Sequence, residues 1–94
     1  MTAKDITLNI AVNLGRIGRF ATEGKNRRVL QFLSETEEYL ELLEKSSKAP
    51  AFLKTFNTFK EKFYILKENV LIDSSWAEDA YTWANILSHR AKLA

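Results

Sequence analysis

The 94-residue chain has no cysteine, a single histidine, one proline and three glycines. Without cysteine it can form no disulfide framework, thiol nucleophile or thiolate metal site, and the lack of cysteine suits a reducing compartment. No uncharged apolar run approaches the roughly 18 to 20 residues of a membrane span. The first residues also lack the charged, apolar and small-residue order of a signal peptide. We therefore expect a soluble cytoplasmic protein that does not enter a membrane.

The chain also has little excess of charge of either sign, with a formal net charge of only +2. Residues 1–28 carry six basic and two acidic side chains, whereas residues 29–44 carry five glutamates and no basic residue. Residues 45–72 return to six basic and two acidic side chains. So small a net charge does not by itself indicate a polyanionic partner. Opposite charges on neighbouring helices would attract one another weakly.

The groupings that catalysis and metal binding require are missing as well. His89 is the only histidine, and no Glu-x-x-His pair of the kind that builds a di-iron site in a helical bundle occurs. No serine or lysine nucleophile stands at a recognisable spacing from a base. We expect a protein that is not an enzyme and that holds neither a metal nor a cofactor.

Helical periodicity is what the chain does have, with apolar residues at steps of three and four in four segments. These segments lie near residues 5–23, 26–45, 50–71 and 75–92. Ser75 and Glu78 form a capping-box pattern at the start of the fourth. Short links force neighbouring helices to run antiparallel. The sequence predicts one all-α domain spanning residues 1–94, an up-down-up-down antiparallel four-helix bundle. The main alternative is a three-helix bundle with one helix displaced to a partner subunit.

The predicted core contains one aromatic stripe and two polar positions. The aromatic stripe along the third segment begins with Phe52, Phe56 and Phe59, at a spacing typical of core residues. Asn13 and Thr36 interrupt the apolar seams of the first two segments. Such buried polar groups need hydrogen-bond partners. A structural role is expected for them, and a ligand pocket at mid-bundle is the alternative.

All three glycines fall in the stretch GRIGRFATEGKNRR, residues 15–28. Gly24 suits the left-handed position that ends a helix. Gly15 and Gly18 lie inside the first helix, where each glycine costs about 1 kcal/mol relative to alanine. That cost predicts close packing of another helix, or of a phenylalanine or tryptophan, against both glycines.

The same stretch holds five of the fourteen basic residues, namely Arg16, Arg19, Lys25, Arg27 and Arg28. Arg27 and Arg28 oppose the macrodipole at the N-terminus of the second helix, which suggests partners such as glutamates of a neighbouring helix. We expect a solvated, salt-bridged rim. The alternative is weak binding of nucleic acid or phosphate by these five cations.

The surface of the first helix indicates self-association. Leu8 and Val12 lie outside its predicted seam, and Gly15 and Gly18 lie beside them. Apolar or small residues thus cover more of this helix than one bundle face can bury. We expect a protein–protein interaction or assembly module that forms a two-fold dimer through Leu8, Val12, Gly15 and Gly18. The alternatives are a different, unidentified protein partner and, less favoured, nucleic acid.

Overall fold

The apolar periodicity of the sequence is realised as four helices. The computed structural model describes all residues, 1–94, and contains α1 (Ala3–Thr22), α2 (Asn26–Lys45), α3 (Pro50–Glu68) and α4 (Ser74–Arg90). A short 3-10 turn, Ala91–Leu93, follows α4, and there is no strand. The predicted all-α four-helix bundle is confirmed, with all four helices packed together in one chain. The helix bounds differ slightly, because α1 begins at Ala3 and α3 ends at Glu68.

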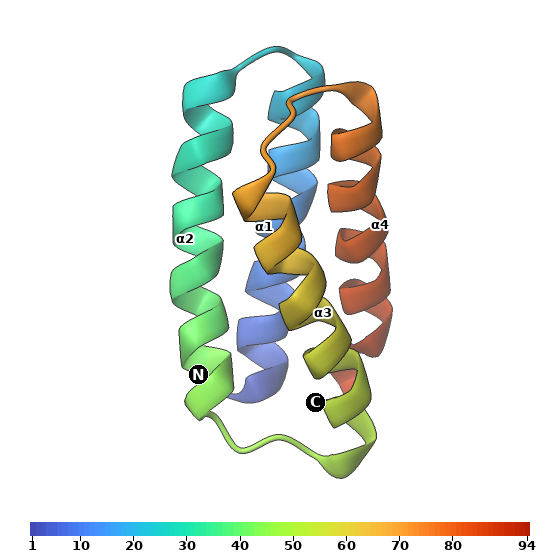
Figure 1. Ribbon diagram of the computed structural model, residues 1–94. Coiled ribbons are helices and arrows are strands. Elements are labelled where there is room, and N and C mark those ends of the chain that lie inside the picture. Colours follow the sequence, from blue (N-terminus) through green and yellow to red (C-terminus); the bar gives the residue numbers. More distant parts are fainter.

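The helices run alternately up and down, and α1 lies between α2 and α4 with α3 in front of it (Figure 1). Both chain termini and the α2–α3 link lie at one end of the bundle. The α1–α2 turn and the α3–α4 link lie at the other. The molecule measures 37 × 19 × 19 Å, as expected for helices of about 30 Å lying side by side. Because α3 lies in front of α1, the solvent-exposed side of α1 faces away from α3.

Side-chain size sets how closely the helices approach. The Phe52, Phe56, Phe59 and Phe63 side chains are all buried, so the predicted aromatic core is confirmed. These large rings hold α3 away from its neighbours, whereas the backbone of α1 approaches α2 and α4 more closely. Small buried residues on α1 and α4, such as Ala11, Gly18 and Ala80, permit that approach.

The two polar core positions are satisfied by hydrogen bonds. The Asn13 amide donates to Glu35 Oε1 at 3.4 Å, and the Arg16 guanidinium donates to Asn13 Oδ1 at 3.4 Å. The Thr36 hydroxyl donates to the carbonyl of Phe32 at 2.6 Å. No buried side-chain polar atom lacks a partner, and no groove is lined by Asn13 or Thr36. The expected structural role is confirmed, and there is no pocket at mid-bundle.

The helix starts show one error in the sequence-based prediction. α4 is capped by Asp73, whose carboxylate accepts a hydrogen bond from the Trp76 backbone N–H at 2.8 Å. The predicted capping box of Ser75 and Glu78 is therefore wrong, since Ser75 already lies inside the helix. Asp73 precedes Ser75 in the chain and satisfies the free N–H groups first. A capping box does occur at α1, between Thr2 and Asp5.

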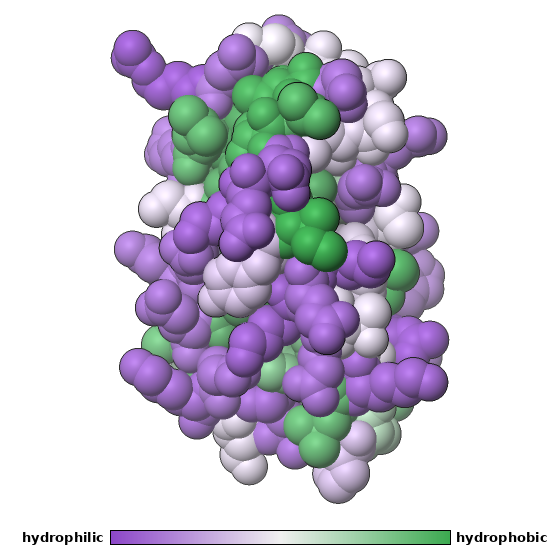
Figure 2. All heavy atoms as spheres, in the orientation of Figure 1, coloured by the Kyte–Doolittle hydropathy of each residue, from purple (hydrophilic) through white to green (hydrophobic).

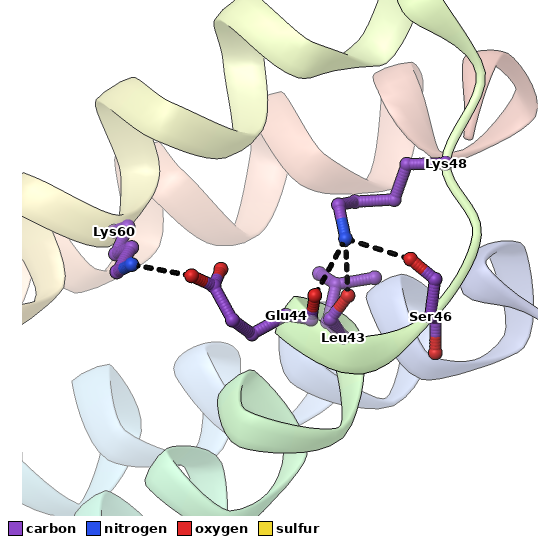
Figure 3. Close-up of polar contacts among 5 residues, drawn as sticks. All are labelled: Leu43, Glu44, Ser46, Lys48 and Lys60. Atoms are coloured by element: carbon purple, nitrogen blue, oxygen red, sulfur yellow. Dashed lines mark hydrogen bonds and ion pairs between the residues drawn. The ribbon is translucent and has the colours of Figure 1, made fainter.

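The end of α2 is closed by a lysine from the following link (Figure 3). Lys48 Nζ donates to the carbonyls of Leu43, Glu44 and Ser46, at 2.7, 3.1 and 2.8 Å. It also lies 4.8 Å from the centroid of the Phe56 ring on α3. A cation at a helix C-terminus complements the macrodipole and satisfies carbonyls that the helix leaves free. Lys48 thus joins the end of α2 to α3.

Candidate interaction surfaces

The outer face of α1 is the first candidate surface. Leu8 is 38% exposed and Val12 is 52% exposed, and Gly15 is half-buried beside them. At about 100° per residue, these three positions fall within roughly 60° of one another around the helix. We call them the α1 outer face. They form a short apolar strip on the exposed side of α1, opposite its buried residues, and Arg19 lies on the same side one turn after Gly15.

The two mid-helix glycines differ in their surroundings. Gly18 is buried, and a Cβ atom added to it would lie 2.9 Å from the Tyr81 ring of α4. The prediction that Gly18 takes part in self-association is therefore wrong, because the Tyr81 ring of the same chain already covers Gly18. A Cβ added to Gly15 would meet no neighbouring atom within 4 Å. The expected close packing of an aromatic residue is confirmed at Gly18, where that residue is Tyr81. At Gly15 the prediction of close packing within the chain is wrong.

A second apolar patch lies on the face that α3 presents to solvent. Figure 2 shows hydrophobic residues gathered at the end of this face where the α3–α4 link lies. Ile65 and Leu71 are 54% and 67% exposed. A groove of about 330 Å³ runs between α3 and α4 and is lined in part by Ile65, Trp76 and Trp83. The Trp76 indole N–H donates to the Leu66 carbonyl at 3.1 Å, so this ring is fixed within the core.

Four of the five predicted basic residues gather around two phenylalanines. The Phe20 and Phe32 rings are stacked, with centroids 5.6 Å apart. Arg19, Lys25 and Arg28 place their charged groups 4.9, 5.7 and 5.9 Å from the Phe20 centroid. Arg16 lies 5.5 Å from the Phe32 centroid. Arg27, at the start of α2, is exposed. We call the two rings and the five cations the basic cluster.

The expected salt bridges are almost entirely missing from the basic cluster. Lys25 pairs with Glu23 at 3.2 Å, but none of the four arginines is in an ion pair. The prediction that the arginines meet glutamates of a neighbouring helix is therefore wrong. Glu37 and Glu44 of α2 instead pair with Lys67 and Lys60 of α3. The glutamates thus serve the α2–α3 side of the bundle.

Sequence reasoning missed the two rings beneath the cations. The three-and-four spacing of apolar residues in the first helix would place Phe20 among its buried residues, but its ring is only half-buried. The spacing of Arg28 and Phe32 was an available signal, because residues four apart lie on the same side of a helix. The stack of Phe20 on Phe32 joins two helices, and the spacing within one helix does not reveal such a contact.

The titratable groups with shifted pKa values all make structural contacts. Hydrogen bonds from the Thr2 backbone and hydroxyl lower the pKa of Asp5. Hydrogen bonds to Glu44 and Glu37 raise the pKa of Lys60 and Lys67. The capping contact at α1 and the two α2–α3 ion pairs account for these directions.

His89 is exposed, and its Nδ1 lies 2.9 Å from the carbonyl of Asn85 one turn earlier in α4. Nowhere do three or more histidine, aspartate or glutamate side chains come together as metal ligands would. None of the four helices combines the length and hydropathy of a membrane-spanning segment.

The fold and these surfaces define a small helical bundle with an exposed apolar face on α1 and an adjoining basic cluster. No family model matches the chain, and no curated protein or solved structure is significantly similar to it.

Proposed function

We propose that the protein is a non-catalytic assembly module in which two copies associate through the α1 outer face. Gly15 carries this proposal. A glycine inside a helix costs about 1 kcal/mol relative to alanine, and the Tyr81 ring explains that cost at Gly18. Nothing in the chain explains it at Gly15, where a Cβ would meet open space. A helix from a second copy can approach the backbone at Gly15 because no side chain stands there.

The neighbouring residues support the same contact. Leu8 and Val12 offer apolar side chains to an approaching helix, and their burial in a dimer would remove apolar surface from water. A two-fold axis that is perpendicular to α1 and passes close to Val12 would set two α1 helices antiparallel, each presenting the same face to the other. Such self-complementary contacts are the commonest form of closed assembly.

The exposed apolar face and the lack of cysteine also favour a particular partner and a particular compartment. A second copy is proposed because one helix face that is apolar and open serves both sides of a two-fold contact. We place the module in the cytoplasm, where a chain without cysteine is well suited to the reducing conditions.

Sedimentation equilibrium at micromolar concentration tests the proposal. The wild-type chain should sediment at about twice its 10.8 kDa mass. Val12→Glu should shift the population to monomer, because a dimer would bury the new carboxylates close to one another. Ile65→Glu is the matched control, since Ile65 is 54% exposed and Val12 is 52% exposed. This control should remain dimeric.

Two results would contradict the proposal. A wild-type mass of 10.8 kDa across the concentration range would remove the dimer. Dissociation by Ile65→Glu, with no effect of Val12→Glu, would move the contact to the α3 face and leave the α1 outer face without a role.

A further inference from the structure

We propose that the basic cluster binds the phosphodiester backbone of nucleic acid without reading its bases. Three cations converge on one Phe20 ring, at 4.9, 5.7 and 5.9 Å from its centroid. Like charges held this close repel one another. Only Lys25 has a carboxylate within ion-pair distance, and none of the four arginines does.

The position of the cations at α2 makes the repulsion greater. Lys25 is the N-cap residue of α2, and its side chain makes no capping hydrogen bond. No acidic residue lies in the first turn of this helix. Lys25, Arg27 and Arg28 therefore add positive charge where the macrodipole is already positive. Helix stability does not explain this arrangement, whereas an anionic ligand would gain from both the side chains and the helix end.

The aromatic rings restrict the arginine side chains in positions from which they can bind phosphate. Arg19 and Arg28 contact the Phe20 ring, and Arg16 contacts the Phe32 ring. Contact with a ring restricts a guanidinium but uses none of its N–H donors. A restricted guanidinium loses less conformational entropy when it forms a two-pronged hydrogen bond to phosphate. The Phe20–Phe32 stack thus positions cations from α1 and α2 on a single surface.

The shape of the surface favours a polymer over a small anion. None of the five grooves in the molecule is lined by a member of the basic cluster. A small anion would remain open to water there, whereas a nucleic-acid strand places successive phosphates against several cations. Phe32 and the cations already occupy the space around the Phe20 ring. Neither ring of the basic cluster is left free for a base to stack upon, so binding by the cluster should not depend on base sequence.

Fluorescence anisotropy with a labelled 20-base-pair DNA duplex tests the inference. At about 50 mM salt we expect micromolar affinity, and the logarithm of the binding constant should fall with log[salt] at a slope of about −3 to −4. Arg27→Gln/Arg28→Gln should weaken binding at least about tenfold and reduce the slope by about 2. This variant removes charges that oppose the α2 macrodipole, so a loss of helix stability would not account for the effect.

The matched control is Lys54→Gln/Lys62→Gln on α3, which lowers the net charge equally. Both lysines are exposed, and neither is in an ion pair. Affinity in this variant should stay within about twofold of wild type if the cluster determines binding. Labelled dA20 and dT20 strands should bind with similar affinity to each other, because the bases are not contacted.

Four results would overturn the inference. The first two are no detectable binding of the duplex at low salt and an equal loss of affinity in the α3 control. The other two are a more than tenfold difference in affinity between the two single strands, and binding of inorganic polyphosphate without binding of DNA. Val12→Gln separates this test from the dimer, because it removes the apolar side chain at the centre of the proposed contact without placing a carboxylate one turn before Arg16. Its affinity for the duplex should equal that of the wild type.

Discussion

At the scale of single residues, the two mid-helix glycines of α1 should respond differently to the same substitution. Gly15→Ala should raise the free energy of unfolding of the monomer by about 0.5 to 1 kcal/mol, because a methyl group there meets open space. Gly18→Ala should gain less, since its Cβ would lie 2.9 Å from the Tyr81 ring and the ring must move. Urea unfolding at a concentration that keeps the chain monomeric measures both changes.

The Tyr81→Ala background is the control for this comparison. Removing the ring should let Gly18→Ala show the full gain from helix propensity, and the difference between backgrounds reports the coupling of the two residues. Equal gains for Gly15→Ala and Gly18→Ala in the wild-type background would contradict the assignment of Tyr81 as the neighbour of Gly18.

The sequence predicted part of this residue-scale picture. Two glycines inside a helical pattern indicated a backbone open to close approach. The identity of the neighbour could not be predicted, because Tyr81 meets Gly18 only at the particular axial offset that α1 and α4 adopt. The basic cluster is similar, since the arginine positions were known but the Phe20–Phe32 stack beneath them depends on how α1 and α2 pack.

At the scale of the element, α2 depends on a residue outside the helix. Lys48→Met should lower the free energy of unfolding by about 2 kcal/mol, because three carbonyl hydrogen bonds to one cation are lost. Lys45→Met is the control, since Lys45 lies in the last turn of α2 and forms no hydrogen bond or ion pair through its side chain. It should cost only a few tenths of a kcal/mol. Thermal or urea unfolding of both variants compares them, and equal losses would contradict the capping role.

The helices themselves were predictable, but their ends were less so. The spacing of Phe52, Phe56 and Phe59 fixed both the type of element and its buried side, because large apolar groups seldom stay in water. Asp73 and Ser75 are both good N-cap residues, and the choice between them depends on where the α3–α4 link enters α4. Lys48 reaches back across the α2–α3 link, and no short motif encodes that contact.

At the scale of the whole molecule, each helix buries one side and leaves the other exposed, so the outer surface determines what the bundle can bind. The α1 outer face and the basic cluster adjoin on α1, where Arg19 follows Gly15 by one turn on the same side of the helix. The Ile65–Leu71 patch lies at the α3–α4 link. The sequence indicated extra apolar residues on α1 but could not separate Gly15 from Gly18. That separation required the position of α4, which covers only one of the two glycines.

Cross-linking through a single introduced cysteine tests the central claim, that two copies meet through the α1 outer face. The chain has no cysteine of its own, so one substitution supplies the only thiol. Residues on a two-fold axis meet their own copies, and a disulfide requires Cα atoms within about 7 Å. Val12→Cys should therefore form a linked dimer under mild oxidation on a non-reducing gel, while Ile65→Cys, of similar exposure, should stay monomeric. A linked dimer from Ile65→Cys alone, or from neither variant, would contradict the account.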